Sequence, residues 1–210
     1  MKPQVLYIFD PLCGWCYGFS EVIYQLYQNH QKEIDFIPIV GGMVTGERIS
    51  TGSKIYDTIA PSLPRLEATT GCTISTTYIE QILKSKVILL NSEPPCRAVM
   101  TIRQLAPAVA MDFVKALQFA HFGRGKDYNI ESTYAALLPQ FEINEQAFFS
   151  LYSSPEVKSH VQQEFDWVKQ ARIGGFPCVV VDINDSLTMI ANGYTPYGEL
   201  ETRLLQLLSQ

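Results

Sequence analysis

The order of apolar and polar residues predicts a strand, a helix and a second strand at the start of the chain. Residues 5–9 are apolar throughout, as in strands that are buried on both faces of a sheet. Asp10-Pro11 ends this run, and the helical spacing of the apolar residues that follow predicts a helix over about 13–30. Residues 33–40 predict the second strand, and Pro38 places it at a sheet edge because proline cannot donate to the ladder. The two strands are expected to pair in parallel.

The middle of the chain shows no clear strand and repeated helix signals. Ser92-Glu93-Pro94-Pro95 is typical of a helix start, since proline is favoured in the first turn. Residues 74–90 are ambiguous, because their first half has helical spacing whereas 87–90 also fits an extended segment. Further helices are expected over residues 96–105, 107–122, 130–138 and 144–152.

Beyond residue 153 the pattern returns to strands. Ser154-Pro155 starts a long helix that Gly174-Gly175 ends. Residues 178–183 and 187–191 predict a β-hairpin, and Thr195-Pro196 starts a last helix.

This order of elements predicts an α/β fold in which a helical domain interrupts a sheet domain. Residues 1–45 and 154–210 are expected to form the sheet domain, in the order β-α-β and then α-β-β-α. Residues 46–153 are expected to form the inserted all-α domain. The chain has 210 residues, of which 47% are hydrophobic, so it can bury a substantial core.

Charge and cysteine content narrow the function classes. The net charge is −5 and the sequence holds no large cluster of Lys and Arg, which argues against a nucleic-acid partner. The apolar run at 5–9 is too short for a signal-peptide core or a membrane span. We therefore expect a cytoplasmic protein without a membrane partner. Its 5 cysteines, an odd number, argue against a framework of structural disulfides.

Cys13 and Cys16 are the candidate catalytic residues. They flank Gly14-Trp15 directly after a buried strand and at the start of a helix. The free N–H groups and the dipole of a helix N-terminus favour a thiolate, which is the reactive form of cysteine. Cys13 is therefore expected to be the more acidic and more exposed thiol, which attacks a substrate disulfide. Cys16, one turn further in, is expected to resolve the mixed disulfide.

A zinc site is the competing interpretation of this pair. One Cys-x-x-Cys motif supplies two ligands, whereas a structural zinc site needs four. Cys72, Cys96 and Cys178 occur singly, so we expect no metal site and three inert thiols. Cys178 is the one of the three that the order of elements could bring near the pair.

Two further residues and one dipeptide are candidates for the site. Phe176-Pro177 precedes a strand; its bond is a candidate cis bond, although an ordinary trans proline is the commoner case. With a cis bond, the Phe176 backbone could pair with an extended substrate. Trp15 is expected to shape the substrate surface. Asp10 is either a proton acceptor for Cys16 or a turn residue before proline, and we favour the turn.

These motifs resemble the thioredoxin fold, and the helical insertion resembles the DsbA family within it. Three stretches, Asp10 to Cys16, Asn91 to Ala98 and Gly175-Phe176-Pro177, are similar to the cytosolic, FrnE-like branch described as predicted protein-disulfide isomerases. The resemblance implies that Cys13 attacks, that Cys16 resolves and that Pro177 is the cis proline. It also implies protein or small-molecule thiols and disulfides as partners, with no bound cofactor and glutathione as a candidate co-substrate.

The dipeptide Gly14-Trp15 departs from the relatives. It lacks the histidine that makes periplasmic DsbA strongly oxidising and the proline of thioredoxin. The reduction potential of DsbA is about −120 mV. We expect the Cys13/Cys16 pair to be less oxidising than this, and the protein therefore to be a reductase or isomerase. Two alternatives stay open. One is a glutathione-dependent enzyme of the kappa-class transferase or 2-hydroxychromene-2-carboxylate isomerase type, and the other is a redox-sensing module without turnover.

Overall fold

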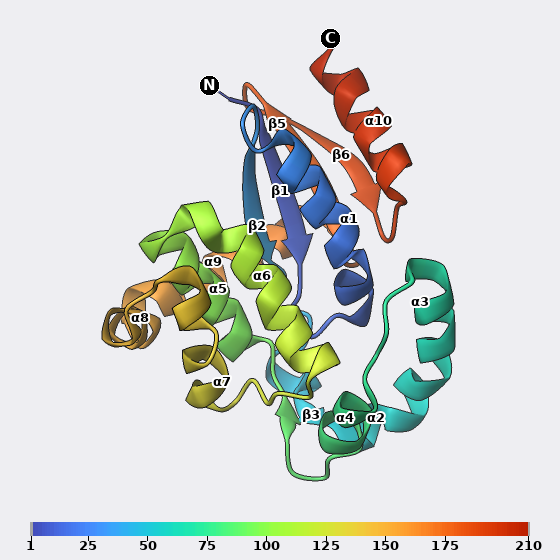
Figure 1. Ribbon diagram of the computed structural model, residues 1–210, viewed down its shortest axis with the longest axis vertical. Coiled ribbons are helices and arrows are strands. Elements are labelled where there is room, and N and C mark those ends of the chain that lie inside the picture. Colours follow the sequence, from blue (N-terminus) through green and yellow to red (C-terminus); the bar gives the residue numbers. More distant parts are fainter. Residues whose placement is uncertain (1, 210) are drawn as a thin grey trace.

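A four-stranded sheet forms one end of the molecule in the computed structural model, which describes residues 2–209 (Figure 1). The strand order is β2 (Asp35–Val40), β1 (Gln4–Phe9), β5 (Cys178–Ile183) and β6 (Ser186–Asn192). β1 pairs with β2 in parallel, and the other two pairs are antiparallel. The predicted parallel pair, the hairpin and the edge position of the strand that holds Pro38 are confirmed.

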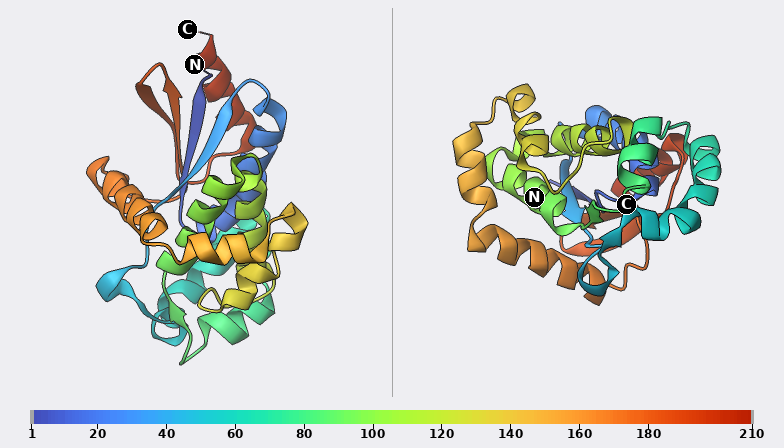
Figure 2. Two further views of the ribbon diagram at one scale, coloured as in Figure 1. Left: turned by 90° about the vertical axis from the view of Figure 1, so that its left-hand side faces the viewer. Right: turned by 90° about the horizontal axis from the view of Figure 1, so that it is seen from below.

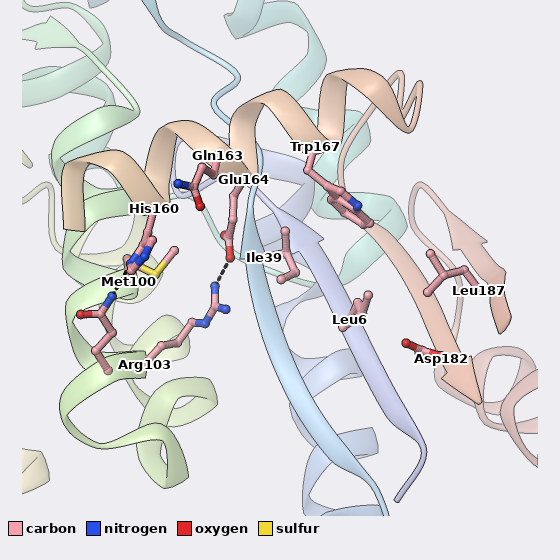
Figure 3. Close-up of a pocket in the computed structure, with 11 residues that line it drawn as sticks. Leu6, Ile39, Met100, Arg103, His160, Gln163, Glu164, Trp167, Asp182 and Leu187 are labelled. Atoms are coloured by element: carbon pink, nitrogen blue, oxygen red, sulfur yellow. Dashed lines mark hydrogen bonds and ion pairs between the residues drawn. The ribbon is translucent and has the colours of Figure 1, made fainter. Parts of the chain in front are cut away.

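Helices cover both faces of this sheet. α1 (Gly14–His30) and α10 (Tyr197–Leu208) pack on one face, and α9 (Pro155–Gln170) packs on the other. Because successive side chains of a strand point to opposite faces, Tyr7 lies in the core beneath α1 and Ile8 in the core beneath α9. α9 crosses the sheet near one end of the strands (Figure 3).

The segment between β2 and α9 is mainly helical, as expected, and shares its core with the sheet domain. Buried residues of α5 and α6 belong to the same cluster as β1 and α1. The segment also holds one short antiparallel ladder, β3 (Ser50–Thr51) with β4 (Leu89–Leu90), so it is not all-α as predicted. The helices are α2 (Gly52–Ile59), α3 (Leu63–Thr70), α4 (Thr76–Tyr78), α5 (Glu93–Leu105), α6 (Ala110–Gln118), α7 (Glu131–Ala135) and α8 (Glu145–Tyr152).

Some boundaries differ from the predictions. The ambiguous stretch 74–90 contains a π-helical turn at Ile79–Leu83 and then the extended Leu89–Leu90. α9 ends at Gln170, before the expected Gly174-Gly175. Its end is set by Arg172, which adopts the left-handed conformation with φ 55° and cannot continue a helix. Met1 and Gln210, the ends of the expected sheet domain, lie outside the described residues.

The helical part lies beyond the end of the sheet toward which β1 runs (Figures 1 and 2). Both chain ends lie at the opposite end of the molecule, in two views at right angles. The turn from β1 into α1 is therefore placed where the two parts meet. Among residues 2–209, no helix combines the length and apolar character that crossing a lipid bilayer requires.

His121 is a neutral buried histidine in the helical part. Its ring stacks on Tyr128 with centroids 4.2 Å apart, and its Nδ1–H donates to the Lys126 carbonyl at 2.8 Å. Burial lowers the pKa of His121 from 6.5 to about 4. The unfolded chain therefore binds a proton at a higher pH than the folded chain does, so stability falls as the pH drops from 6.5 towards 4.

We predict that wild-type protein loses about 2 kcal/mol more unfolding free energy between pH 7 and pH 5 than His121→Phe loses. The phenylalanine ring retains the stack but cannot bind a proton. Urea unfolding at the two pH values measures the difference. His160→Gln, which changes a partly exposed histidine bonded to Gln104, should behave as wild type. Equal losses in wild type and His121→Phe would contradict the assignment.

Candidate active site

Cys13 lies at the junction of the turn after β1 and the first turn of α1. It is the N-cap of the helix, and its Sγ accepts a hydrogen bond from the Cys16 backbone N–H at 3.3 Å. The turn is closed by the Cys13 N–H, which donates to the Asp10 carbonyl at 3.0 Å. The predicted helix start is confirmed, and a free N–H group of the first turn, that of Cys16, points at the Cys13 sulfur.

Cys16 lies behind Cys13 in the core. Neither thiol is joined to another cysteine in this structure. Cys13 is 5% exposed and Cys16 is 0% exposed, which confirms the expected order of exposure. Burial, followed by the neighbouring Cys13, raises the pKa of the Cys16 thiol well above its ordinary value. Cys16 is therefore a protonated thiol at neutral pH.

The Phe176-Pro177 bond is cis and faces the pair. The Cys13 thiol donates to the Phe176 carbonyl at 3.7 Å, across 163 residues of sequence. Gly41 explains how the Phe176 ring fits beside the loop after β2, because a Cβ at Gly41 would lie 2.1 Å from that ring. The sequence indicated Phe176-Pro177 as a candidate, but not the fit of the Phe176 ring against Gly41, because the two positions are far apart in the chain.

Asp10 is a buried carboxylate that ties three separate segments together. One oxygen accepts from the Leu12 N–H and the Ser92 hydroxyl, both at 2.9 Å, and the other accepts from the Met43 N–H at 2.6 Å. The bond to Leu12, two residues on, closes the turn that the sequence favoured. Ser92 also pairs with the Val44 backbone in both directions. The loop after β2 and the start of α5 are thereby fixed beside the active-site turn.

The environment of Asp10 has opposing effects on its charge. Burial raises the pKa of this carboxyl, and the bonds from Met43, Leu12 and Ser92 partly offset the rise. Ser92 was predicted only as a helix-start residue, and its side chain makes no cap bond. Its contact with Asp10 joins positions 82 residues apart, which no local pattern can reveal.

A groove of about 670 Å³ opens in front of Cys13. Trp15 and Phe176 line it, as do two basic residues that the sequence did not single out, Arg48 and Lys169. Both basic side chains belong to exposed residues. The groove can therefore receive a disulfide-bearing molecule next to Cys13, with cations available for its anionic groups.

A second, larger cavity lies away from the pair. It has a volume of about 750 Å³ and lies between α9 and the sheet face that carries Leu6 and Ile39 (Figure 3). Trp167 extends over this face, and Glu164 pairs with Arg103 at its edge (Figure 3). Neither Cys13 nor Cys16 lines this cavity.

The other three thiols are separate from the pair. Cys178 packs in the core beneath α9, on the opposite face of the sheet from Cys16, and burial raises its pKa to about 11. Burial also raises the pKa of Cys96 and of the partly exposed Cys72. Within the part of the chain that the structure describes, no three His, Cys, Asp or Glu side chains are grouped as metal ligands are.

Comparison with known proteins agrees with this geometry. The model of a family described as "DSBA-like thioredoxin domain" matches residues 4–204. The chain belongs to this DSBA-like thioredoxin family. The family is one of thiol–disulfide oxidoreductases, and the fold expected from the resemblance is confirmed. A search of curated proteins gave no match.

Solved structures extend the family assignment. A protein of Nitrosomonas europaea that has been proposed to be a protein disulfide isomerase is 28% identical, with a TM-score of 0.87, over 100% of this chain and 99% of that one. The cytosolic disulfide reductase DsbM of Pseudomonas aeruginosa is 21% identical, with a TM-score of 0.82, and the match covers 99% of this chain and 100% of that one. A 2-hydroxychromene-2-carboxylate isomerase, 16% identical with a TM-score of 0.63 over 98% and 93%, shares the fold.

We predict that Asp10→Ala lowers the unfolding free energy by about 3 kcal/mol, because three hydrogen bonds are lost and the partly buried Met43 N–H loses its acceptor. Urea unfolding measures the change. Asp35→Ala is the matched control: its side chain is 53% exposed and 3.9 Å from Lys2, so its effect should stay below about 0.5 kcal/mol. Equal effects of the two variants would refute the structural role of Asp10.

We also predict that iodoacetamide labels Cys13 at least about tenfold faster than Cys16 at neutral pH, because only the thiolate reacts and the pKa of Cys16 is raised. Labelling followed by peptide mass spectrometry measures the two rates. The Cys72→Ser chain removes a partly exposed thiol and should give the same ratio. Faster labelling of Cys16 would reverse the assigned roles.

Proposed function

We propose that this protein is a reductase or isomerase of disulfides that works by exchange through Cys13 and Cys16. One observation carries the proposal: Cys13 caps α1 at the floor of an open groove, with a protonated Cys16 buried directly behind it. Such a pair has one thiol for attack and another that is held back until a mixed disulfide has formed. No metal or bound cofactor is part of the proposed reaction.

In the reductive direction the reaction has two exchanges. The Cys13 thiolate attacks a substrate disulfide, so a bond forms between Cys13 and one substrate sulfur while the other leaves as a thiolate. Cys16 then loses its proton and attacks the Cys13 sulfur, which releases the second substrate thiolate and forms the Cys13–Cys16 disulfide. Two electrons pass to the substrate, and a thiol such as glutathione restores the pair. The reverse sequence gives oxidation of a substrate dithiol. In isomerisation, a second substrate thiolate attacks the mixed disulfide in place of Cys16, so that a new substrate disulfide forms and Cys13 leaves as a thiolate.

The groove supports protein or small-molecule thiols as partners. We propose that Trp15 and Phe176 bind the substrate beside Cys13 and that Pro177 holds the Phe176 backbone in place. Glutathione carries two carboxylates, for which Arg48 and Lys169 offer cations. Pseudomonas aeruginosa DsbM has been solved with GSH, which supports glutathione as co-substrate. The likeness to a cytosolic reductase likewise supports a cytoplasmic location.

The direction of the reaction depends on the dipeptide between the cysteines. Gly14-Trp15 provides no histidine to stabilise the Cys13 thiolate. A less stable reduced form makes a weaker oxidant, so we propose that reduction or isomerisation is favoured over oxidation.

The two alternatives are less well supported. The likeness to the 2-hydroxychromene-2-carboxylate isomerase concerns the fold, and a glutathione-activating serine would make the second cysteine unnecessary. A redox sensor would need the pair, but would not turn over.

We predict that Cys16→Ser reduces glutathione-coupled turnover of a disulfide substrate such as insulin by at least about 100-fold and accumulates a mixed disulfide at Cys13. The mutant can attack but cannot resolve. Coupled assays and intact-protein mass spectrometry measure the two effects.

Two further variants complete this experiment. Cys13→Ser should lose turnover without forming a mixed disulfide, and Cys72→Ser should keep wild-type turnover. Unchanged turnover in Cys16→Ser would contradict the proposed role of Cys16, because glutathione alone would then resolve the mixed disulfide at Cys13. Stoichiometric oxidation of wild type without turnover would favour the sensor.

A further inference from the structure

When Cys16 attacks the mixed disulfide, its thiol proton must leave a buried site. The inference below concerns the path of this proton and rests on the proposed exchange reaction. Cys16 is fully buried, so its proton cannot pass directly to solvent. Asp10 is one neighbouring acceptor, but both of its oxygens already accept hydrogen bonds from Leu12, Ser92 and Met43. The side of Cys16 that faces the sheet holds a different polar group, the hydroxyl of Tyr7.

Tyr7 places a neutral hydroxyl beside the resolving cysteine. The residue is 0% exposed, and its hydroxyl donates to the Cys16 carbonyl at 3.4 Å. Burial, followed by the nearby thiols of Cys16 and Cys13, raises the pKa of Tyr7 well above its ordinary value. A neutral phenol can accept one hydrogen bond while it donates another. Because the bond to the carbonyl is long, the hydroxyl hydrogen can turn elsewhere at little cost.

Gln118 on α6 faces the same hydroxyl from the other side. It is 0% exposed and lies close enough to Tyr7 to lower the pKa of the phenol. Although the Gln118 amide lies near the Tyr7 hydroxyl, neither its nitrogen nor its oxygen meets the distance and angle of a hydrogen bond with any group of residues 2–209. A buried amide without partners costs about 1–3 kcal/mol for each missing bond, so a bound water is the expected explanation.

A cavity of the right size adjoins both side chains. It measures about 10 Å³ and is lined by Tyr7 and Gln118, with Ser20 and Lys115. One water needs about 10–15 Å³ and two to four polar partners, which Tyr7, Gln118 and Ser20 can supply. The Lys115 side chain is 34% exposed, so this end of the cavity lies next to solvent.

We propose that a water molecule in this cavity, held by Gln118 and Tyr7, carries the proton of Cys16 between the buried thiol and solvent. When Cys16 attacks, its S–H proton passes to the Tyr7 oxygen while the Tyr7 hydroxyl proton passes to the water. The water releases a proton past Lys115. The Cys16 thiolate forms the bond to Cys13, and the substrate thiolate leaves with the electron pair. Tyr7 ends neutral, and the reverse reaction returns the proton by the same route.

Other titratable groups surround this route. Cys13 and Asp10 act on Cys16 from the active-site turn. At the outer end, the Lys115 ammonium lies 2.9 Å from Glu21 and 4.1 Å from the ring centroid of Tyr24. Lys115 is thus paired outside the cavity, and none of these groups bonds to the unpaired amide of Gln118.

The test uses 5,5′-dithiobis(2-nitrobenzoate) with the reduced full-length chain in a Cys72→Ser background. The first thionitrobenzoate released reports attack by Cys13, and the second reports attack by Cys16 on the mixed disulfide. We expect Tyr7→Phe to slow the second release about 100-fold at neutral pH. Gln118→Leu should slow it about tenfold, as expected for loss of one positioning hydrogen bond. The first release should be unchanged in both variants.

The pH dependence separates a proton route from a packing role. In a variant that lacks the proton route, hydroxide must remove the Cys16 proton. The slowing of the second release in Tyr7→Phe and Gln118→Leu should therefore shrink as the pH rises. Tyr134→Phe is the matched control, because it removes another buried hydroxyl, which donates to the Tyr128 carbonyl; its release should match wild type. Asp10→Asn tests the rival acceptor.

Several outcomes overturn the proposal. One is a second release at the wild-type rate in both Tyr7→Phe and Gln118→Leu. Another is a slowing of the second release that is the same at every pH. The third is a pH-dependent slowing that occurs in Asp10→Asn alone. If Tyr7→Phe does not fold, Gln118→Leu decides. A wild-type chain that gives no second release refutes the exchange function itself, which is a separate result.

Discussion

The geometry of the site depends on one buried carboxylate. Asp10 accepts hydrogen bonds from its own turn, from the loop after β2 and from the residue before α5. These three segments come from the sheet domain and from the helical insertion. Their common anchor fixes the end of β1, and with it the place where α1 begins. Cys13 is the N-cap of that helix, so its position depends on the bonds of the Asp10 carboxylate as well as on its own bond to the Asp10 carbonyl.

The two cysteines differ because the fold gives them different surroundings. Cys13 lies where helix N–H groups, the Phe176 carbonyl and an open groove meet. Cys16 lies one turn deeper, where burial keeps it protonated. Attack and resolution therefore need different kinds of support: a surface that receives substrate at Cys13 and an exit for a proton at Cys16. A buried hydroxyl and an unpaired amide lie on the side where such an exit would be needed.

The sequence predicted the features that are encoded locally. The apolar run 5–9, the helix start at the cysteines and the hairpin after Phe176-Pro177 follow from spacing and turn chemistry, and the structure confirms them. The contacts of Ser92 with Asp10 and of Gln118 with Tyr7 were not predictable, because each joins distant segments and depends on how the helices pack. The ladder of β3 and β4 was missed because each strand has only two residues.

The most direct measurement of the central claim is the redox equilibrium of the Cys13/Cys16 pair against glutathione. It can be followed by Trp15 fluorescence in a Trp167→Phe chain, since Trp167 lies over the sheet beneath α9 and away from the pair (Figure 3). We expect one reversible two-electron transition, with a potential more negative than that of DsbA, which is about −120 mV. A potential at or above that value, or no reversible transition, would contradict it.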